Sequence, residues 1–294
     1  MRRIYLILVF FLWISCDKIE PPYTQSNNNL AERTVLIEKF TGHKCSNCPE
    51  ASRKVDELQE FYGNNLISVA IHPGDLIEFT GTDDNYPYDF TTNASDTISN
   101  DMGASFLPLG TVNRIPGGIS NRCWTKEEWA TQIDNLLYDN EGNPLPNNVE
   151  IEINTSLNKQ NKELSIQTDF TLNNNLEGNY KLCLFIMEDG IIAPQIDGTE
   201  YIENYEHKHI YRSSVNTVYG EDISEFSLPD VPSSGEFANQ FMYSATHLIQ
   251  FNSDYNINWN EEWNNAHNCY VVAYIYNSQT LIIEESAVQQ IINE

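Results

Sequence analysis

The chain has 294 residues, enough for two domains of ordinary size that each bury a core. Its 42 acidic and 16 basic residues give a formal net charge of −26, which would repel nucleic-acid phosphates and anionic membrane surfaces. We therefore expect no nucleic-acid partner. The 12% aromatic and 40% hydrophobic content is typical of globular domains and argues against a disordered chain.

The N-terminus follows the plan of a signal peptide. Two arginines precede the apolar segment 4–14, which ends just before Ser15 and Cys16. This segment is too short to span a bilayer core, which needs about 20 residues. A small residue before a cysteine is typical of the cleavage site of bacterial lipoprotein signals. We therefore predict a signal peptide at residues 1–15 and lipid attachment at Cys16, with ordinary secretion or an uncleaved anchor as alternatives.

Residues 16–32 are predicted to form a flexible tether. They contain two prolines and a run of asparagines but no apolar periodicity. An exported protein also meets an oxidising environment, in which disulfides persist.

Residues 34–72 are predicted to form a strand, a helix and a second strand. Segment 34–40 is rich in β-branched and apolar residues, and segment 49–62 repeats apolar residues at helical spacing. Segment 66–72 is a near-continuous apolar run, which is typical of a strand buried on both faces of a parallel sheet. Together they predict a βαβ unit.

The next elements complete an α/β domain that we place at residues 33–140. Segment 106–114 is predicted to be a strand entered through Pro108. In segment 125–138, a threonine followed three residues later by a glutamate forms a capping box and predicts the start of a helix.

The character of the chain changes after a linker that we place at residues 141–148, where turn-forming residues are concentrated. Residues 149–294 show alternation or short apolar runs separated by turns. This pattern predicts antiparallel strands, and we expect an immunoglobulin-like β-sandwich.

The sequence HKCSNCPE places Cys45 and Cys48 where the first strand ends and the first helix begins. Residues three apart on a helical turn share a face, so the two sulfurs can meet. The positive end of the helix dipole favours a thiolate and lowers the pKa of a cysteine from its usual value of about 8.5. We therefore predict thiol–disulfide exchange, in which Cys45 attacks from the exposed turn and Cys48 resolves the mixed disulfide.

Three other interpretations compete with exchange. Attachment of a c-type haem needs a histidine directly after the second cysteine, where Pro49 stands. A metal could use His43 and His72, but a second C-x-x-C is absent, and both histidines are more simply polar residues of a turn and a strand end. We therefore predict neither a metal nor a cofactor. An inert disulfide is the third alternative, although so short a loop constrains the unfolded chain little.

The remaining cysteines and a second pair of histidines carry weaker signals. Cys183 and Cys269 lie in predicted strands, and we favour buried free thiols over a bridge between them. Cys123 has no assigned partner. His207 and His209 alternate, which on a strand would place both on one face, but a polar strand face is a simpler interpretation than a metal site.

These motifs together resemble two groups of known proteins. The order strand, C-x-x-C, helix and strand, followed by a strand entered through a proline, resembles the thioredoxin fold. The lipoprotein-like leader and the segments KFTGHKCSNCPEA, VAIHPGD, PLGTVNR, YEHKHIYR and VVAYIYN are similar to the outer membrane protein 28-related lipoproteins of Gram-negative bacteria. This similarity runs over most of the mature chain.

The resemblance implies a thioredoxin-like domain followed by a β-sandwich, held by lipid to the periplasmic or surface face of the outer membrane. It also implies that Pro108 is a cis-proline that faces the dithiol and keeps a substrate's extended chain beside Cys45. Lys44 stands where thioredoxins carry a tryptophan, which weakens the analogy with a general reductase. The predicted function is thiol–disulfide exchange on envelope proteins, and the alternative is a non-catalytic binding or assembly lipoprotein.

Overall fold

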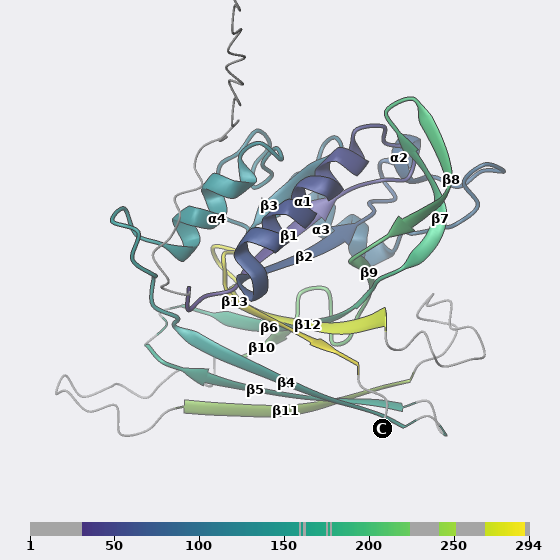
Figure 1. Cartoon of the computed structure of the whole chain (residues 1–294). Coiled ribbons are helices and arrows are strands. Elements are labelled where there is room, and N and C mark those ends of the chain that lie inside the picture. Colours follow the sequence, from purple (N-terminus) through teal and green to yellow (C-terminus); the bar gives the residue numbers. More distant parts are fainter. Residues whose placement is uncertain are drawn as a thin grey trace, which may run out of the picture.

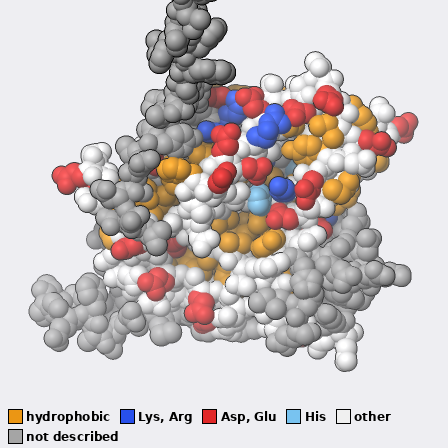
Figure 2. Space-filling view, in the orientation of Figure 1, with side chains coloured by type: hydrophobic (Ala, Val, Ile, Leu, Met, Phe, Trp, Pro, Cys, Tyr) orange, Lys and Arg blue, Asp and Glu red, His pale blue; other side chains and the backbone are white. Residues whose placement is uncertain are grey.

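The computed structural model describes residues 31–158, 160, 163–174, 176, 178–223, 241–250 and 268–291, with the backbone alone for 241–250. The described chain is a mixed α/β structure with one large sheet and two smaller ones (Figure 1). Acidic side chains are spread over the face shown in Figure 2, and lysines and arginines lie mainly in its upper part. Cys16 and the predicted signal peptide lie outside the described residues.

The predicted βαβ unit is confirmed. Strands β1 (Val35–Phe40) and β2 (Leu66–Ile71) are parallel neighbours, and helix α1 (Cys48–Tyr62) with the 3₁₀ turn η1 (Gly63–Asn65) joins them. Every residue of both strands is buried, as the near-continuous apolar run of β2 predicts for that strand. A glycine with φ of 57° follows the last helical residue, where a side chain would be strained.

Helices α1 and α4 (Trp129–Leu137) cover one face of this part of the sheet through an apolar cluster. The predicted pairing of Thr125 with Glu128 is present, because the Thr125 N–H donates to the Glu128 carboxylate at 3.1 Å. The helix itself begins at Trp129, later than the capping box predicts.

Strand β3 (Leu109–Val112) is antiparallel to β1 and forms the edge of the large sheet. Between β2 and β3 lie two helices, α2 (Ile77–Thr80) and α3 (Asn93–Met102). The hydroxyl of Thr92 accepts from the N–H of Ser95 at 3.0 Å and so caps α3. Helix α3 adds apolar side chains to the cluster that also contains the two cysteines of the C-x-x-C sequence.

The large sheet continues beyond β2 into strands from the second half of the chain. Its order is β13-β12-β6-β9-β2-β1-β3, with β10 beside β6. The added strands are β6 (Tyr180–Glu188), β9 (Ile210–Ser214), β10 (Glu221–Asp222), β12 (Cys269–Asn277) and β13 (Ile283–Gln290). Strands β2 and β9 join where Ala70 pairs with Ile210. The linker at 141–148 stays a prediction, and strands from both sides of it share one sheet.

A three-stranded sheet packs against the second half of the large sheet. It consists of β4 (Val149–Asn158), β5 (Glu163–Leu172) and β11 (Phe241–Gln250), in the order β11-β5-β4. Alternate residues of β4, β5, β6 and β12 fill the apolar cluster between the two layers. No α-helix occurs among the described residues after β4 begins.

A buried ion pair ties the α/β elements to the strands of the second half. Arg114 donates to the Glu38 carboxylate from two nitrogens, at 2.8 and 2.5 Å, and also to the hydroxyl of Tyr274 in β12 at 2.9 Å. Thr111 donates to the same carboxylate at 2.8 Å. Both charged residues are almost fully buried, so the pair belongs to the joint between the two halves.

Strands β7 (Ile191–Asp197) and β8 (Glu200–His207) form a separate antiparallel hairpin. Figure 1 shows this hairpin rising beside the start of α1. It is the element that brings the second half of the chain to the C-x-x-C loop.

Candidate functional site

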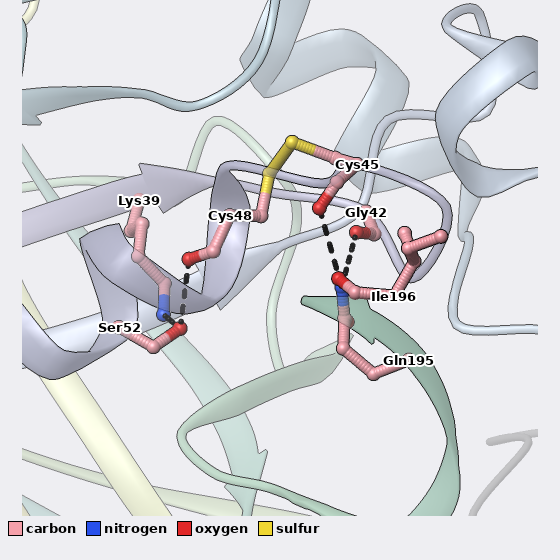
Figure 3. Close-up of a disulfide and its surroundings, with 7 residues drawn as sticks. All are labelled: Lys39, Gly42, Cys45, Cys48, Ser52, Gln195 and Ile196. Carbon is pink, nitrogen blue, oxygen red and sulfur yellow. Dashed lines mark hydrogen bonds between the residues drawn. A yellow bond between two sulfur atoms is a disulfide. The ribbon is translucent and has the colours of Figure 1, made fainter. Parts of the chain in front are cut away.

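The two cysteines of the C-x-x-C sequence form a disulfide at the start of α1 (Figure 3). Their sulfurs lie 2.13 Å apart and their Cα atoms 5.4 Å apart. Cys48 is the first helical residue, and its N–H donates to the carbonyl of Cys45 at 3.2 Å. The structure therefore brings together the pair that the sequence predicts.

Both cysteines are buried, so the expectation that Cys45 lies in an exposed turn is wrong. Cys45 is 2% exposed and Cys48 is 1% exposed. They pack with apolar residues of β1, α3 and the segment that leads into β3, namely Phe40, Ile98, Met102, Leu107 and Leu109. An incoming thiol reaches neither sulfur in this conformation.

Pro108 lies where the sequence places it, directly before β3. The Leu107–Pro108 peptide bond is cis, and Leu107 belongs to the apolar cluster of the two cysteines. Pro108 itself is partly exposed. Its role in holding a substrate stays a prediction.

The β7–β8 hairpin binds the backbone of the C-x-x-C loop. The N–H of Ile196 donates to the carbonyl of His43 at 3.0 Å, and the N–H of Gly198 donates to that of Ser46 at 2.8 Å. The buried amide of Gln195 donates to the carbonyls of Gly42 and Cys45, both at 3.3 Å. Figure 3 shows that the two bonds from Gln195 reach the carbonyl side of the loop, with the sulfurs on the other side.

Helix α2 and the residues after it hold the same loop. The N–H of Lys44 donates to the carbonyl of Phe79 at 2.9 Å, and a ring nitrogen of His43 lies 3.1 Å from the carbonyl of Gly81. The Lys44 ammonium pairs with Asp83 at 2.5 Å and lowers the pKa of that carboxyl. Lys44 is therefore engaged in an ion pair at the surface.

Comparison with known proteins identifies the family. The sequence model of the family described as outer membrane protein Omp28 matches residues 95–294, which is more than half of the chain. The chain belongs to the Omp28 family. This match includes Pro108 and the β7–β8 hairpin but begins after the disulfide. None of the curated proteins compared with the chain matches it.

Two solved structures are similar to this Omp28-family chain. HBP35 of Porphyromonas gingivalis aligns with 90% of this chain and 76% of its own, at a TM-score of 0.60 and 11% identity. A domain of the outer membrane lipoprotein Omp28 from the same organism aligns with 51% of this chain and 93% of its own, at a TM-score of 0.32 and 13% identity. The likeness to HBP35 shows the fold alone, and the family assignment rests on the sequence match.

The Omp28 family is one of outer membrane proteins, yet none of the described helices has the length and apolar character needed to cross a membrane. The described residues also contain no group of three or more histidines, cysteines or carboxylates placed to hold a metal ion.

A cavity of about 210 Å³ lies beside Cys48 in this Omp28-family chain. Residues from β1, β2, α1, β7 and β8 line it, and among them Lys39, Cys48 and Ser52 are drawn in Figure 3. The Lys39 ammonium donates to the Ser52 hydroxyl at 2.6 Å, and that hydroxyl donates to the carbonyl of Cys48 at 3.3 Å. Lys39 is 5% exposed, and burial lowers its pKa to about 8.

Sequence reasoning missed Lys39. The signal that could have found it is the adjacent pair of opposite charges, Glu38 and Lys39, inside an otherwise apolar strand. A strand buried on both faces offers neither charge a place in water, so each needs a partner or a cavity.

Three histidines surround the ring of Phe90 close to this cavity. The ring centroids of His43, His72 and His207 lie 5.7, 4.6 and 4.5 Å from that of Phe90. His43 lies in a turn and His72 directly follows β2, as the sequence predicts, but both are buried, so His43 is not a solvated turn residue. Burial also lowers the pKa of all three rings, to about 3 for His207, so they are neutral near pH 7.

The structure also places the second pair of histidines and the three cysteines that lie beyond the C-x-x-C sequence. His207 ends β8, whereas His209 lies in the following turn with φ of 60°, so the two do not share one strand face as the alternation predicts. Cys123, Cys183 and Cys269 are buried free thiols. Cys183 faces the apolar cluster of the C-x-x-C cysteines and Cys269 faces the cluster between the two sheets, so these two thiols lie on opposite faces and cannot pair.

Proposed function

We propose that this protein is an outer-membrane lipoprotein that performs thiol–disulfide exchange on envelope proteins through Cys45 and Cys48. The observation that carries the proposal is the disulfide at the first turn of α1. The free N–H groups and dipole at the start of a helix favour the thiolate form after reduction. As a staple, a loop this short would constrain the unfolded chain little.

The proposal includes a thioredoxin-like fold for residues 33–140 and an immunoglobulin-like β-sandwich for residues 149–294. The parallel β1–β2 pair, the helix between them and antiparallel β3 support the first assignment. The packing of the three-stranded sheet on β6 and β12 supports the second. In this arrangement Cys45 attacks, Cys48 resolves, and Pro108 shapes the substrate site.

Burial of the disulfide sets a condition on exchange. Because Cys45 is 2% exposed, the segments packed over its sulfur must move before a substrate thiol or disulfide can react with it. We therefore expect slow reaction with small thiols and faster reaction with a protein that stabilises the opened form.

Trapping of a mixed disulfide tests the exchange function. In Cys48→Ala, Cys45 has no resolving partner, so we expect envelope proteins to remain bound to it through a bond that dithiothreitol cleaves. The variant that lacks both cysteines should trap none, and Cys269→Ala, which removes a buried thiol in the cluster between the two sheets, should behave as the wild type. Equal trapping by the double variant would contradict exchange.

The burial of both cysteines also favours a second candidate, a non-catalytic binding or assembly lipoprotein in which the disulfide fixes the loop. In that case envelope proteins would bind equally well to the wild type and to the variant without both cysteines, and the complexes would survive dithiothreitol.

The lipid anchor is part of the proposal and depends on Cys16. We expect Cys16→Ser to abolish the incorporation of labelled fatty acid and to release the protein from the membrane fraction. Retention in the membrane without lipid would instead indicate an uncleaved apolar anchor.

A further inference from the structure

The ammonium of Lys39 is a buried cation in the wall of the cavity of about 210 Å³. Its pKa of about 8 leaves it mostly charged near pH 7, and the charge of Asp56 favours this form. An ammonium has three N–H donors. Within the described chain one of them has an acceptor, the hydroxyl of Ser52 at 2.6 Å (Figure 3). Lys39 therefore has donors left for a ligand in the cavity.

Two buried histidines line the same cavity, and each has a ring nitrogen without a partner. His72 is 2% exposed and His207 is 4% exposed. Nδ1 of His72 and Nε2 of His207 make no hydrogen bond within the described part of the chain. The two ring centroids lie 6.4 Å apart, and the charge of Lys39 lowers the pKa of both rings. Buried polar groups are normally hydrogen-bonded, so these nitrogens indicate where a polar ligand belongs.

Both rings are neutral near pH 7, because burial lowers the pKa of each. A neutral imidazole carries one N–H and can hold it on either nitrogen. Each ring can therefore donate one hydrogen bond to an acceptor. Together with the Lys39 ammonium, they form a set of donors that matches the oxygens of an anion.

The volume of the cavity limits the ligand to a small molecule. About 210 Å³ is far more than the roughly 10–15 Å³ that one water needs and less than the roughly 300 Å³ of the smallest typical ligand pockets. The wall also includes the apolar side chains of Val55, Ala70 and Ile210. A ligand with a charged end and a short apolar part fits such a lining.

The charges at the rim favour a ligand with a single negative charge. Asp56 and Glu206 are exposed at the rim with Lys208, which leaves the rim with a net charge of about −1. The half-buried Tyr205 and His209 and the disulfide-bonded Cys48 are the other titratable residues that line the described cavity. One buried cation balances one negative charge. A second charge on the ligand would have no counter-charge and would be repelled by the rim carboxylates.

We propose that this cavity binds the carboxylate of a small monocarboxylic acid, with the Lys39 ammonium as its counter-charge and the N–H groups of His72 and His207 as donors. The site does not depend on the exchange function, because neither cysteine sulfur takes part in binding. The bound carboxylate pairs a charge whose burial otherwise costs stability and gives both ring nitrogens a partner.

Saturation-transfer NMR of the purified full chain tests the proposal with acetate as the probe. At pH 7, with sodium chloride keeping the ionic strength constant, the acetate methyl signal should show saturable transfer from the protein. Acetamide has nearly the same shape without the charge and should not displace acetate. Phosphate, which is largely a dianion above pH 7, should displace acetate at least tenfold less effectively than acetate itself. Absence of saturable acetate binding, or equal displacement by acetamide or phosphate, would overturn the proposal.

A pair of lysine variants separates the site from general charge effects. Lys39→Met should weaken acetate binding at least tenfold, because the buried counter-charge is lost. Lys54→Met is the matched control, since Lys54 pairs with Glu57 at 3.3 Å and does not line the cavity. It should leave the affinity unchanged. An unchanged affinity in Lys39→Met, or an equal loss in Lys54→Met, would overturn the proposal.

The two histidines are tested by replacement with an apolar ring. His72→Phe and His207→Phe keep an aromatic ring against Phe90 but remove the nitrogens. Each variant should bind acetate at least threefold more weakly. An affinity that stays unchanged in both variants would overturn the proposal.

The pH dependence of the unmodified protein covers the case in which the variants do not fold. A carboxylate is ionised above about pH 5, and the Lys39 amine loses its proton near its pKa of about 8. The affinity for acetate should therefore be constant between about pH 6 and 7 and fall as the pH rises through 8. Acetate should in turn raise the midpoint of Lys39 in nitrogen-15 NMR of the lysine side chains. A constant affinity up to about pH 10, or a midpoint that acetate does not move, would overturn the proposal.

Discussion

The buried side chain of Lys39 destabilises the folded protein at pH values below the pKa of its amine in the folded state. The side chain is nearly fully buried, and its folded pKa of about 8 lies below the usual value of about 10.4 for lysine. Between these values the unfolded chain holds a proton that the folded chain has lost, so stability rises with pH across this window. Below about pH 8 the charged amine is buried at a cost of about 3 kcal/mol.

We therefore expect Lys39→Met to stabilise the protein at pH 7 by about 1–3 kcal/mol, after the loss of the bond to Ser52 is counted. The gain should shrink as the pH rises from about 8 to about 10.4. Urea unfolding at a series of pH values measures it, with Lys54→Met as a control expected to stay within about 0.5 kcal/mol. A destabilised Lys39→Met at pH 7 would show that burial of the charge is not the dominant effect.

Single residues were predictable where a local motif specifies them. The C-x-x-C spacing at a strand-to-helix junction predicts the position of Cys45 and Cys48 correctly. Their burial was not predictable, because it depends on α3 and on the segment before β3, far along the chain. The same applies to His43, which contacts residues more than 35 positions away.

At the scale of elements, the β7–β8 hairpin depends on two unequal contacts with the α/β part of the chain. Arg53 binds Asp197 through two nitrogens, at 2.7 and 3.3 Å, but the arginine is 55% exposed, so the pair contributes about 0.2–1 kcal/mol. Gln195 is buried and donates to several carbonyls of the C-x-x-C loop and its own strand. The amide should therefore hold the hairpin more strongly than the ion pair.

We predict that Gln195→Ala loosens the hairpin by about 1–2 kcal/mol, because hydrogen bonds in a buried site are lost. Amide hydrogen exchange at Ile196 and Gly198 should accelerate, and Arg53→Ala should change it less. The opposite order of the two variants would contradict the ranking. Mass spectrometry of peptides from β7 provides the measurement.

The sequence predicts β1, α1 and β2 well because their apolar periodicity is strong. It does not predict the hairpin, because every residue of β8 before His207 is exposed or half-exposed and the strand has no apolar face to reveal it. The hairpin is stabilised by backbone bonds to the C-x-x-C loop, and such bonds leave no mark in the composition of a strand.

At the scale of the whole molecule, the large sheet joins the two predicted domains. Strands β1, β2 and β3 share it with β6, β9, β12 and β13. The Glu38–Arg114 pair and its bond to Tyr274 cross the same joint. The sequence alone separates the two halves because their patterns of apolar residues differ. The pairing of Ala70 with Ile210 joins residues 140 positions apart, so no local sequence pattern indicates it.

We expect Glu38→Gln to destabilise the whole chain by about 3–5 kcal/mol, because Arg114 would remain buried without its counter-charge. Unfolding should stay a single transition when it is followed by both near-ultraviolet and far-ultraviolet circular dichroism. Tyr274→Phe, which removes the β12 hydroxyl that accepts from Arg114, should cost about 1 kcal/mol. Two separate transitions, with only one of them lowered, would show that the halves unfold independently.

The reduction potential of the Cys45–Cys48 pair tests the proposed exchange function most directly. Equilibration of the purified protein with glutathione buffers, read by alkylation and mass spectrometry, gives its value. Thiol–disulfide exchange predicts a potential between about −270 and −120 mV, the range of known dithiol exchange proteins. A potential below about −300 mV would identify a structural disulfide and contradict the proposed function.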